Sequence, residues 1–172
     1  MLLKSVRGFT PSYGSDCFFA ENATLIGDII MGEQCSVWYQ AVIRGDVNSI
    51  RIGNRVNIQD GAVIHATYKK ASTHIGNNVS VGHNAIVHGC LIQDNVLIGM
   101  GSIVMDQCEI GSNSIIAAGA VVPQGTIVPS GSIYAGIPAK KIKSLTEDLQ
   151  KNELERIAKN YVLYASWFKN GE

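Results

Sequence analysis

The sequence predicts an all-β solenoid: a parallel β-helix built from hexapeptide repeats, with one α-helix at its C-terminal end. Aliphatic residues recur every six positions through most of the 172 residues, and a glycine often follows them directly. A period of six fits neither a single helix nor an antiparallel hairpin sheet, whereas three hexapeptides can form one triangular coil. After about Tyr134 this period stops, and from Leu145 onwards apolar residues recur at helical spacing instead.

The hexapeptide repeat covers the chain from about Tyr13 to Tyr134. With three hexapeptides to a coil, this span makes roughly seven coils, and their inward aliphatic side chains stack into one continuous core. An antiparallel β-sandwich, the competing fold, would need two-residue alternation and regular hairpin turns. The aliphatic positions of the repeat are Leu25, Met31, Val37, Ile43, Ile52, Ile58, Ile64, Ile75, Val81, Val87, Ile92, Ile98, Val104, Ile110, Ile116, Val122 and Val128.

The C-terminal segment predicts an amphipathic helix. Ser144 and Glu147 have the spacing of a capping box, which marks a helix start. The apolar stripe that follows must pack on one face of the solenoid, either of its own subunit or of a neighbour. We therefore divide the chain into a β-helix domain, residues 1–138, and a linker with the C-terminal helix, residues 139–172. The stripe consists of Leu145, Leu149, Leu154, Ile157, Tyr161, Ala165 and Phe168.

Composition limits which binding partners and which cellular compartment we expect. The chain has 14 Lys and Arg against 14 Asp and Glu, so no global charge draws it to nucleic acid or to an anionic membrane. The first residues, MLLKSVRGF, lack the apolar core of a signal peptide, and no run is long enough to span a bilayer. The four cysteines form no CxxC pair, which favours reduced thiols. We expect a cytoplasmic protein without nucleic-acid or membrane partners.

The order of the repeats also predicts which outward side chains stack on one another. Each break in the period is counted as an insertion or deletion within one side of a coil. One side, here called side a, carries the inward residues Leu25, Ile43, Ile64, Val87, Val104 and Val122. The residues directly after three of these are Arg44, His65 and His88, which fall in consecutive coils. Strands in adjacent coils lie about 4.8 Å apart. Two stacked histidines at that separation can place nitrogens ~2.0–2.1 Å from one zinc ion.

His83 falls on a different side of the coil, side c, in a column with Asp60. Five near-extended residues of ~3.3 Å each separate it from His88, so it cannot easily reach a metal that His88 of the same chain binds. If three solenoids pack around a threefold axis, side c of one meets side a of the next. His83 would then complete the ligand set of a neighbouring subunit. The fourth histidine, His74, follows the loop 66–73, and we expect it to match no column and to be structural or solvated.

Four stretches resemble the gamma-class carbonic anhydrase family: VIRGDVNSIRIG (42–53), NIQDGAVIH (57–65), VGHNAIVHG (81–89) and AGIPAK (135–140). No single hexapeptide is specific, but the ordered set Arg-Gly-Asp, Gln-Asp, His and His-x4-His is. The resemblance covers nearly the whole chain. It implies a left-handed β-helix that assembles as a homotrimer, with Zn2+ or alternatively Fe2+ at each subunit interface. His65 and His88 would bind the metal from one subunit and His83 from the next.

The same resemblance assigns roles to further polar residues. One matched pair of charges helps to organise the subunit interface, with a second acid beside it. The charged pair is Arg44 and Asp60, and the acid beside it is Asp46. Gln59 matches the residue that holds the metal-bound water, and Asn57 matches a polar residue near it. Tyr161 resembles a tyrosine that reaches the pocket from the C-terminal helix. The sequence departs from the family pattern in the loop ATYKKAST (66–73), which has two lysines and no acid where a proton-shuttling glutamate is expected.

The function implied is reversible hydration of CO2 to bicarbonate at a three-histidine metal site. Because the loop 66–73 lacks an acid, proton export would need another group or a buffer molecule. Two alternatives remain open. The same solenoid supports CoA-dependent acyl transfer or thioester hydrolysis, which needs a catalytic histidine free of metal. Alternatively, the protein is an assembly module with weak catalytic activity, in which the metal only links the subunits. A thioester assay and a test for metal-dependent association separate the three cases.

Overall fold

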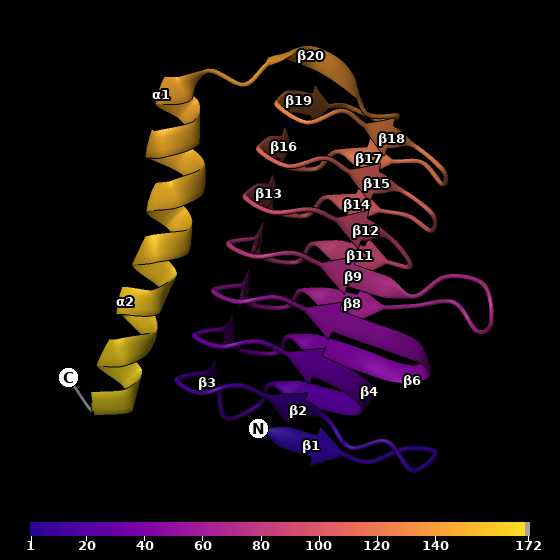
Figure 1. The fold of residues 1–172 in the computed structure, drawn as a ribbon, viewed down its shortest axis with the longest axis vertical. Coiled ribbons are helices and arrows are strands. Elements are labelled where there is room, and N and C mark those ends of the chain that lie inside the picture. The colour runs from indigo at the N-terminus through magenta and orange to yellow at the C-terminus, as the bar shows by residue number, and fades with distance from the viewer. Residues whose placement is uncertain (171–172) are drawn as a thin grey trace.

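A computed structural model describes residues 1–170 as a parallel β-solenoid of about seven turns with a helical segment along one side (Figure 1). The solenoid is the left-handed hexapeptide-repeat β-helix, so the predicted fold class is confirmed. Its strands form a 12-stranded sheet that bends over two sides of the prism and an 8-stranded sheet on the third. Within residues 1–170, no helix combines the length and apolar character that a membrane span needs.

The 12-stranded sheet covers sides a and b, and the 8-stranded sheet is side c. Strands β4 and β6 pass from side a to side b without a break. Side a contains β1 (Leu2–Lys4), the first parts of β4 (Thr24–Met31) and β6 (Val42–Ile52), β8 (Val63–His65), β11 (Ile86–His88), β14 (Ile103–Val104) and β17 (Val121–Val122). Side b contains β2 (Ser12–Tyr13), the later parts of β4 and β6, β9 (Thr73–Ile75), β12 (Leu91–Ile92), β15 (Glu109–Ile110) and β18 (Ile127–Val128). Side c contains β3 (Phe18–Phe19), β5 (Ser36–Val37), β7 (Asn57–Ile58), β10 (Ser80–Val81), β13 (Val96–Ile98), β16 (Ser114–Ile116), β19 (Ser132–Ala135) and β20 (Lys140–Ser144).

The predicted columns are confirmed by the strand register. Neighbouring strands pair Ile64 with Val87 on side a and Ile58 with Val81 on side c. The inward aliphatic side chains of these columns are fully buried, with 0 % exposure for Ile64, Val87, Ile58 and Val81. Burial of one such column after another supplies the apolar free energy that a single coil could not supply alone.

The C-terminal end of the solenoid differs from the prediction. The expected linker contains a strand, β20, which pairs antiparallel with β19 and covers the last coil. Ser144 is the final residue of this strand, so it cannot cap the helix. Thr146 is the N-cap instead, and its side chain accepts a hydrogen bond from the Leu149 backbone N–H at 3.3 Å. The predicted capping box is therefore wrong.

The helical segment consists of α1 (Glu147–Leu149), a π-helical turn η1 (Gln150–Glu155) and α2 (Arg156–Asn170). It runs back along side c towards the N-terminal end of the solenoid (Figure 1). Leu154 is 3 % exposed, and Trp38 of the solenoid packs its ring against Tyr161 and Phe168, each 5.4 Å away between ring centroids. The apolar stripe therefore docks on the solenoid of its own chain.

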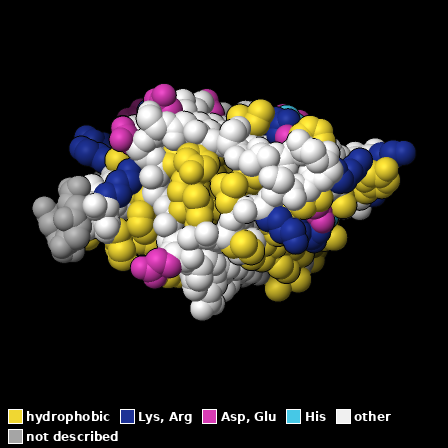
Figure 2. All heavy atoms as spheres, turned by 90° about the horizontal axis from the view of Figure 1, so that it is seen from below, with side chains coloured by type: hydrophobic (Ala, Val, Ile, Leu, Met, Phe, Trp, Pro, Cys, Tyr) yellow, Lys and Arg dark blue, Asp and Glu magenta, His cyan; other side chains and the backbone are white. Residues whose placement is uncertain are grey.

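Figure 2 looks onto the N-terminal end of the solenoid, where hydrophobic side chains gather at the surface. Exposed hydrophobic residues in this first part of the chain are Met1, Leu2, Leu3, Phe9 and Tyr13. The first coil has no coil beneath it, so side chains that would be covered inside the stack face solvent here.

Candidate metal centre

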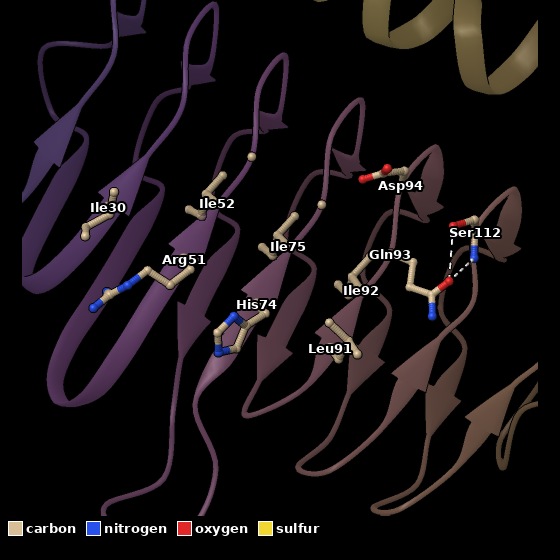
Figure 3. A pocket seen from close by; sticks show the side chains of 12 residues that line it. Ile30, Arg51, Ile52, His74, Ile75, Leu91, Ile92, Gln93, Asp94 and Ser112 are labelled. Carbon is tan, nitrogen blue, oxygen red and sulfur yellow. Dashed lines mark hydrogen bonds between the residues drawn. The ribbon is translucent and has the colours of Figure 1, made fainter.

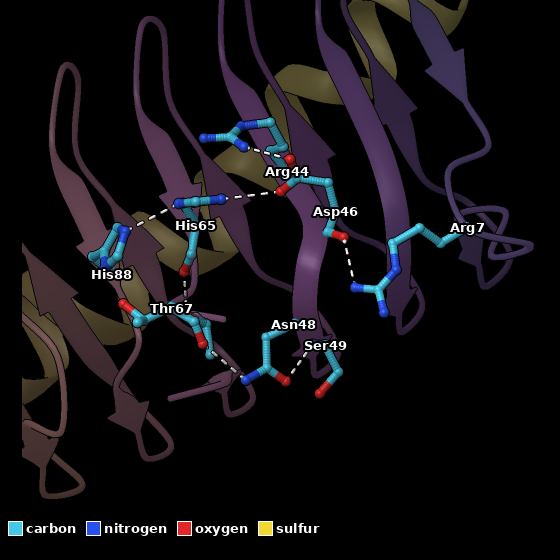
Figure 4. Close-up of polar contacts among 9 residues, drawn as sticks. Arg7, Arg44, Asp46, Asn48, Ser49, His65, Thr67 and His88 are labelled. Atoms are coloured by element: carbon cyan, nitrogen blue, oxygen red, sulfur yellow. Dashed lines mark hydrogen bonds and ion pairs between the residues drawn. The ribbon is translucent and has the colours of Figure 1, made fainter. Parts of the chain in front are cut away.

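His65 and His88 lie side by side on side a. They end the adjacent parallel strands β8 and β11, whose register pairs the two residues directly. His65 Nδ1 and His88 Nε2 are 3.0 Å apart (Figure 4). The hexapeptide repeat produces this approach because it places equivalent positions of successive coils one strand spacing apart.

A carboxylate holds the other ring nitrogen of each histidine. His65 Nε2 is 3.1 Å from Asp46 Oδ1, and His88 Nδ1 is 2.6 Å from Asp106 Oδ1. A neutral imidazole has one N–H, and a carboxylate partner fixes it on the nitrogen that faces the carboxylate. When both rings are neutral and each N–H points to its carboxylate, the two nitrogens that face each other, 3.0 Å apart, both present lone pairs. Two lone pairs this close repel each other, and a cation between them removes the repulsion. Histidines that bind a metal usually donate their other ring N–H to a partner such as a carboxylate.

The electrostatics of the site favour a neutral His65 and ionised carboxylates. Burial lowers the pKa of His65. Burial alone would raise the pKa of Asp46, but hydrogen bonds from His65 and Arg44 lower it overall. Arg44 Nη1 lies 2.5 Å from Asp46 Oδ2. A neutral imidazole is the form that binds metal, so the donor set suits a divalent cation.

Asp106 was not identified from the sequence. It lies one coil beyond His88, two positions after the side-a residue Val104, and so just outside the column that contains the histidines. Its second oxygen accepts a hydrogen bond from the Thr67 hydroxyl at 2.6 Å. Burial would raise the pKa of Asp106, but hydrogen bonds from Thr67 and His88 lower it. The only sequence signal for Asp106 was an acid one coil away from a candidate ligand.

The other predicted residues form a second polar cluster on side c. His83 Nδ1 is 2.8 Å from Asp60 Oδ2, in the column that was predicted for the pair. The Gln59 side-chain oxygen accepts from the His83 backbone N–H at 3.2 Å, and its amide donates to Asn57 Oδ1 at 2.9 Å. Asn57 in turn donates to Ser80 Oγ at 2.8 Å. These contacts fix the orientation of the buried Gln59 amide.

The two clusters do not meet within one chain. Among residues 1–170, no three His, Cys, Asp or Glu side chains come together as a metal site. Arg44 pairs with Asp46 and Asp60 with His83, so the expected Arg44–Asp60 pair is not formed inside the subunit. A third metal ligand would therefore have to come from another subunit. An Arg44–Asp60 pair could likewise form only between two subunits.

Tyr161 lies beside the side-c cluster. It lines a pocket of about 380 Å³ between α2 and side c, together with Gln59 and His83. Burial raises the pKa of Tyr161 to about 12, so the phenol is neutral at physiological pH. The helix therefore closes one wall of the cavity in which Gln59 and His83 are found.

His74 is exposed, as predicted, but the prediction that it matches no column is wrong. It does belong to a column, on side b, where the register pairs it with Arg51 on one neighbouring strand and Leu91 on the other. Figure 3 shows the three side chains along an open groove of about 580 Å³. The His74 ring is exposed and hydrogen-bonds to Ser72 Oγ at 3.1 Å. The long insertion before β9 hid this column in the sequence.

These features define a class of protein: a left-handed hexapeptide-repeat solenoid with two carboxylate-held histidines stacked on one side and a polar cluster with a third histidine on another. The chain belongs to the gamma-class carbonic anhydrase family of hexapeptide-repeat proteins. It is 42 % identical over 163 residues to a carbonic anhydrase of Geobacillus kaustophilus, covering 95 % of this chain and 88 % of that protein. The family model described as Dynactin subunit 5 also matches residues 14–166.

Two further relatives extend the comparison. Gamma carbonic anhydrase 2 of Arabidopsis thaliana, a mitochondrial protein, is 39 % identical over 93 % of this chain, which spans 59 % of that protein's length. A crystal structure of a Bacillus cereus protein that carries an acetyltransferase name superposes with a TM-score of 0.94 at 38 % identity, covering 99 % of this chain and 98 % of that one. Both names occur on closely similar solenoids, so the fold does not distinguish lyase from transferase.

Proposed function

We propose that the protein is a metal-dependent lyase that hydrates CO2 reversibly to bicarbonate at a site shared between the subunits of a cytoplasmic homotrimer. The observation that carries the proposal is the close approach of His65 Nδ1 and His88 Nε2, 3.0 Å apart, in two rings that each contact a carboxylate through the other nitrogen. An acyltransferase has no need for two imidazoles that face each other in this way. The carbonic anhydrase names of similar proteins support the same chemistry.

The metal would be held by His65 and His88 of one subunit and His83 of the next. Three imidazoles suit Zn2+ and, alternatively, Fe2+. When bound, such a metal supplies the Lewis acidity that lowers the pKa of a water to about 7, a value known from carbonic anhydrase itself. Asp46 and Asp106 keep the two stacked rings in the tautomer and orientation that ligation needs.

The remaining residues would act on the substrate side. Gln59, oriented by Asn57 and by the His83 backbone, is positioned to orient the oxygen that attacks CO2. Tyr161 and α2 limit the access of bulk water to the same cavity. The loop 66–73 has no acidic acceptor for the proton released, so another group or a dissolved buffer would take it.

A second function is favoured by one specific contact. His83 is held by Asp60 through Nδ1, which leaves Nε2 free to act as a general base in the manner of a His–Asp pair. Without metal, that arrangement suits acyl transfer or thioester hydrolysis. The acetyltransferase name of the Bacillus cereus structure belongs to this class.

The test is CO2 hydration by protein of known metal content. Protein purified without oxygen is analysed for metal, stripped, and reloaded with Zn2+ or Fe2+. We expect hydration only in the loaded forms, with a rate that rises with buffer concentration. Fully metallated protein that shows no hydration in any buffer, but turns over a CoA thioester, would overturn the proposal in favour of the second function.

A further inference from the structure

Two cysteines lie next to each other on side c, away from the candidate metal centre. Strands β3 and β5 pair Phe18 with Ser36, which places the preceding residues Cys17 and Cys35 opposite each other on the first two coils. The Phe18 N–H donates to the Cys35 carbonyl at 2.8 Å, so the register extends to the cysteines. Adjacent strands are about 4.8 Å apart, within the 4.4–6.8 Å between Cα atoms that a disulfide spans.

We propose that Cys17 and Cys35 form a redox-active dithiol, a modification site that closes to a disulfide when peroxide oxidises it and reopens with a thiol reductant. Both cysteines are free thiols in the structure. The proposal is independent of the function of the metal centre, because it needs only the register of the first two coils.

The two thiols have different environments, as a reactive pair requires. Cys17 is partly exposed, whereas Cys35 is 1 % exposed. The Cys35 thiol and the charge of Lys169 lower the pKa of Cys17 to about 7, against the opposing effect of burial. Lys169 is held close because its ammonium group donates to the Asp16 carbonyl. Cys17 is therefore the thiol that presents a thiolate to solvent at neutral pH.

Cys35 has the properties of the second, resolving thiol. Its interaction with Cys17 and its burial both raise its pKa, so it stays protonated until Cys17 has reacted. It also donates to the Gly53 carbonyl at 3.2 Å, which keeps its sulfur on the same corner of the prism. A buried thiol beside an oxidised neighbour can reach nothing but that neighbour.

The chemistry balances with hydrogen peroxide as the oxidant. The Cys17 thiolate attacks one peroxide oxygen, the O–O bond breaks, and the departing hydroxide takes a proton to become water. Cys35 sulfur then attacks the sulfenic sulfur of Cys17; the S–S bond forms, the S–O bond breaks, and the hydroxide that leaves takes the Cys35 proton. Two thiols supply two electrons, and one peroxide becomes two waters.

The chain contains its own control. Cys90 and Cys108 occupy the same relation one coil apart on side b, because β12 and β15 pair Leu91 with Glu109. Both are almost completely buried, at 3 % and 2 % exposure. The register is the same, but an oxidant has little access to either thiol and burial raises the pKa of both, so this pair should stay reduced.

The experiment treats the full, metal-loaded protein with a small excess of hydrogen peroxide. We expect the loss of two of the four thiols, a mass lower by about 2 Da for the two hydrogens removed, and a Cys17–Cys35 cross-link in the peptide map. Dithiothreitol should restore both thiols. The Cys90→Ser/Cys108→Ser variant should behave in the same way, because the reacting pair is intact.

Single variants locate each step. Cys35→Ser should stop at a sulfenic acid on Cys17 that dimedone traps, and Cys17→Ser should lose no thiol at the same peroxide dose. The disulfide closes a loop of one coil, so the oxidised wild type should melt roughly 5 °C higher than the reduced form. A cross-link at Cys90–Cys108, a disulfide between chains, or no thiol loss before bulk methionine oxidation would each overturn the proposal.

Discussion

At the scale of single residues, the site depends on which ring nitrogen carries the proton. Asp46 and Asp106 each fix an N–H on the far side of a histidine, so the near sides both accept. Two acceptors 3.0 Å apart repel until an electrophile lies between them. In the proposed site, the two carboxylates would orient the histidines before a metal binds, so removing one carboxylate should lower the affinity for the metal first.

Asp106→Ala tests this preparation. Without the carboxylate, the His88 ring can rotate or change tautomer, and we expect the affinity for Zn2+ to fall about 10- to 100-fold. Competition against a chromophoric chelator measures it. Asp148→Ala, an acid at the exposed helix start, should leave the affinity unchanged. Equal affinities for all three proteins would mean that Asp106 does not position His88.

Gln59→Ala separates binding from turnover. The Gln59 amide contacts Asn57 and the His83 backbone but is not a metal donor, so metal content and assembly should be retained. CO2 hydration should fall about 10- to 1000-fold, the range for groups that orient a ligand or stabilise a transition state. Gln93→Ala on side b is the control, because the Gln93 side chain bonds to Ser112 and Glu109, away from the candidate site. A loss of metal in Gln59→Ala would contradict the positioning role.

At the scale of elements, the helical segment packs along side c and covers it. The five-residue step from Leu149 to Leu154 is longer than one α-helical turn of 3.6 residues. The π-helical turn Gln150–Glu155 lies within this step and accommodates the additional residue. This extra residue rotates Leu154 onto the solenoid, where it is buried. The spacing was visible in the sequence, but the π turn that reconciles it with continuous packing was not.

Leu154→Ala should lower the free energy of unfolding by about 2–5 kcal/mol, because it leaves a cavity under the helix. Leu163→Ala is the matched control on the same helix; Leu163 is 51 % exposed, and its truncation should change stability by no more than about 0.5 kcal/mol. Urea unfolding of both variants gives the comparison. Similar values for the two would show that the helix contributes little to stability through Leu154.

At the scale of the whole molecule, one chain carries two incomplete clusters on different sides. His65 and His88 are on side a, and His83 with Gln59 is on side c. In the homotrimer that we propose, side c of one subunit would meet side a of the next at every interface. Each subunit would then give half of two different sites.

Mixed subunits test the shared site. His83→Ala keeps an intact side a and His88→Ala an intact side c, so neither variant alone should hold metal. In random trimers from an equal mixture, about a quarter of the interfaces join the two intact halves, and that fraction of sites should recover metal and activity. A mixture of His65→Ala with His88→Ala is the control, since both lack side a, and should recover none. Recovery in both mixtures, or in neither, contradicts the model.

The sequence by itself determined the solenoid, its columns and the stacking of His65 on His88, because a six-residue period, with its breaks placed within single sides, fixes which positions repeat along the prism axis. It did not determine what lies diagonally across coils or around corners. Asp106 reaches His88 from the next coil, and His74 joins a column only after a long loop is accommodated. Thr146 replaces Ser144 as the cap because β20 pairs with β19 first. Such contacts depend on three-dimensional proximity between segments of different phase, and only the tertiary structure decides them.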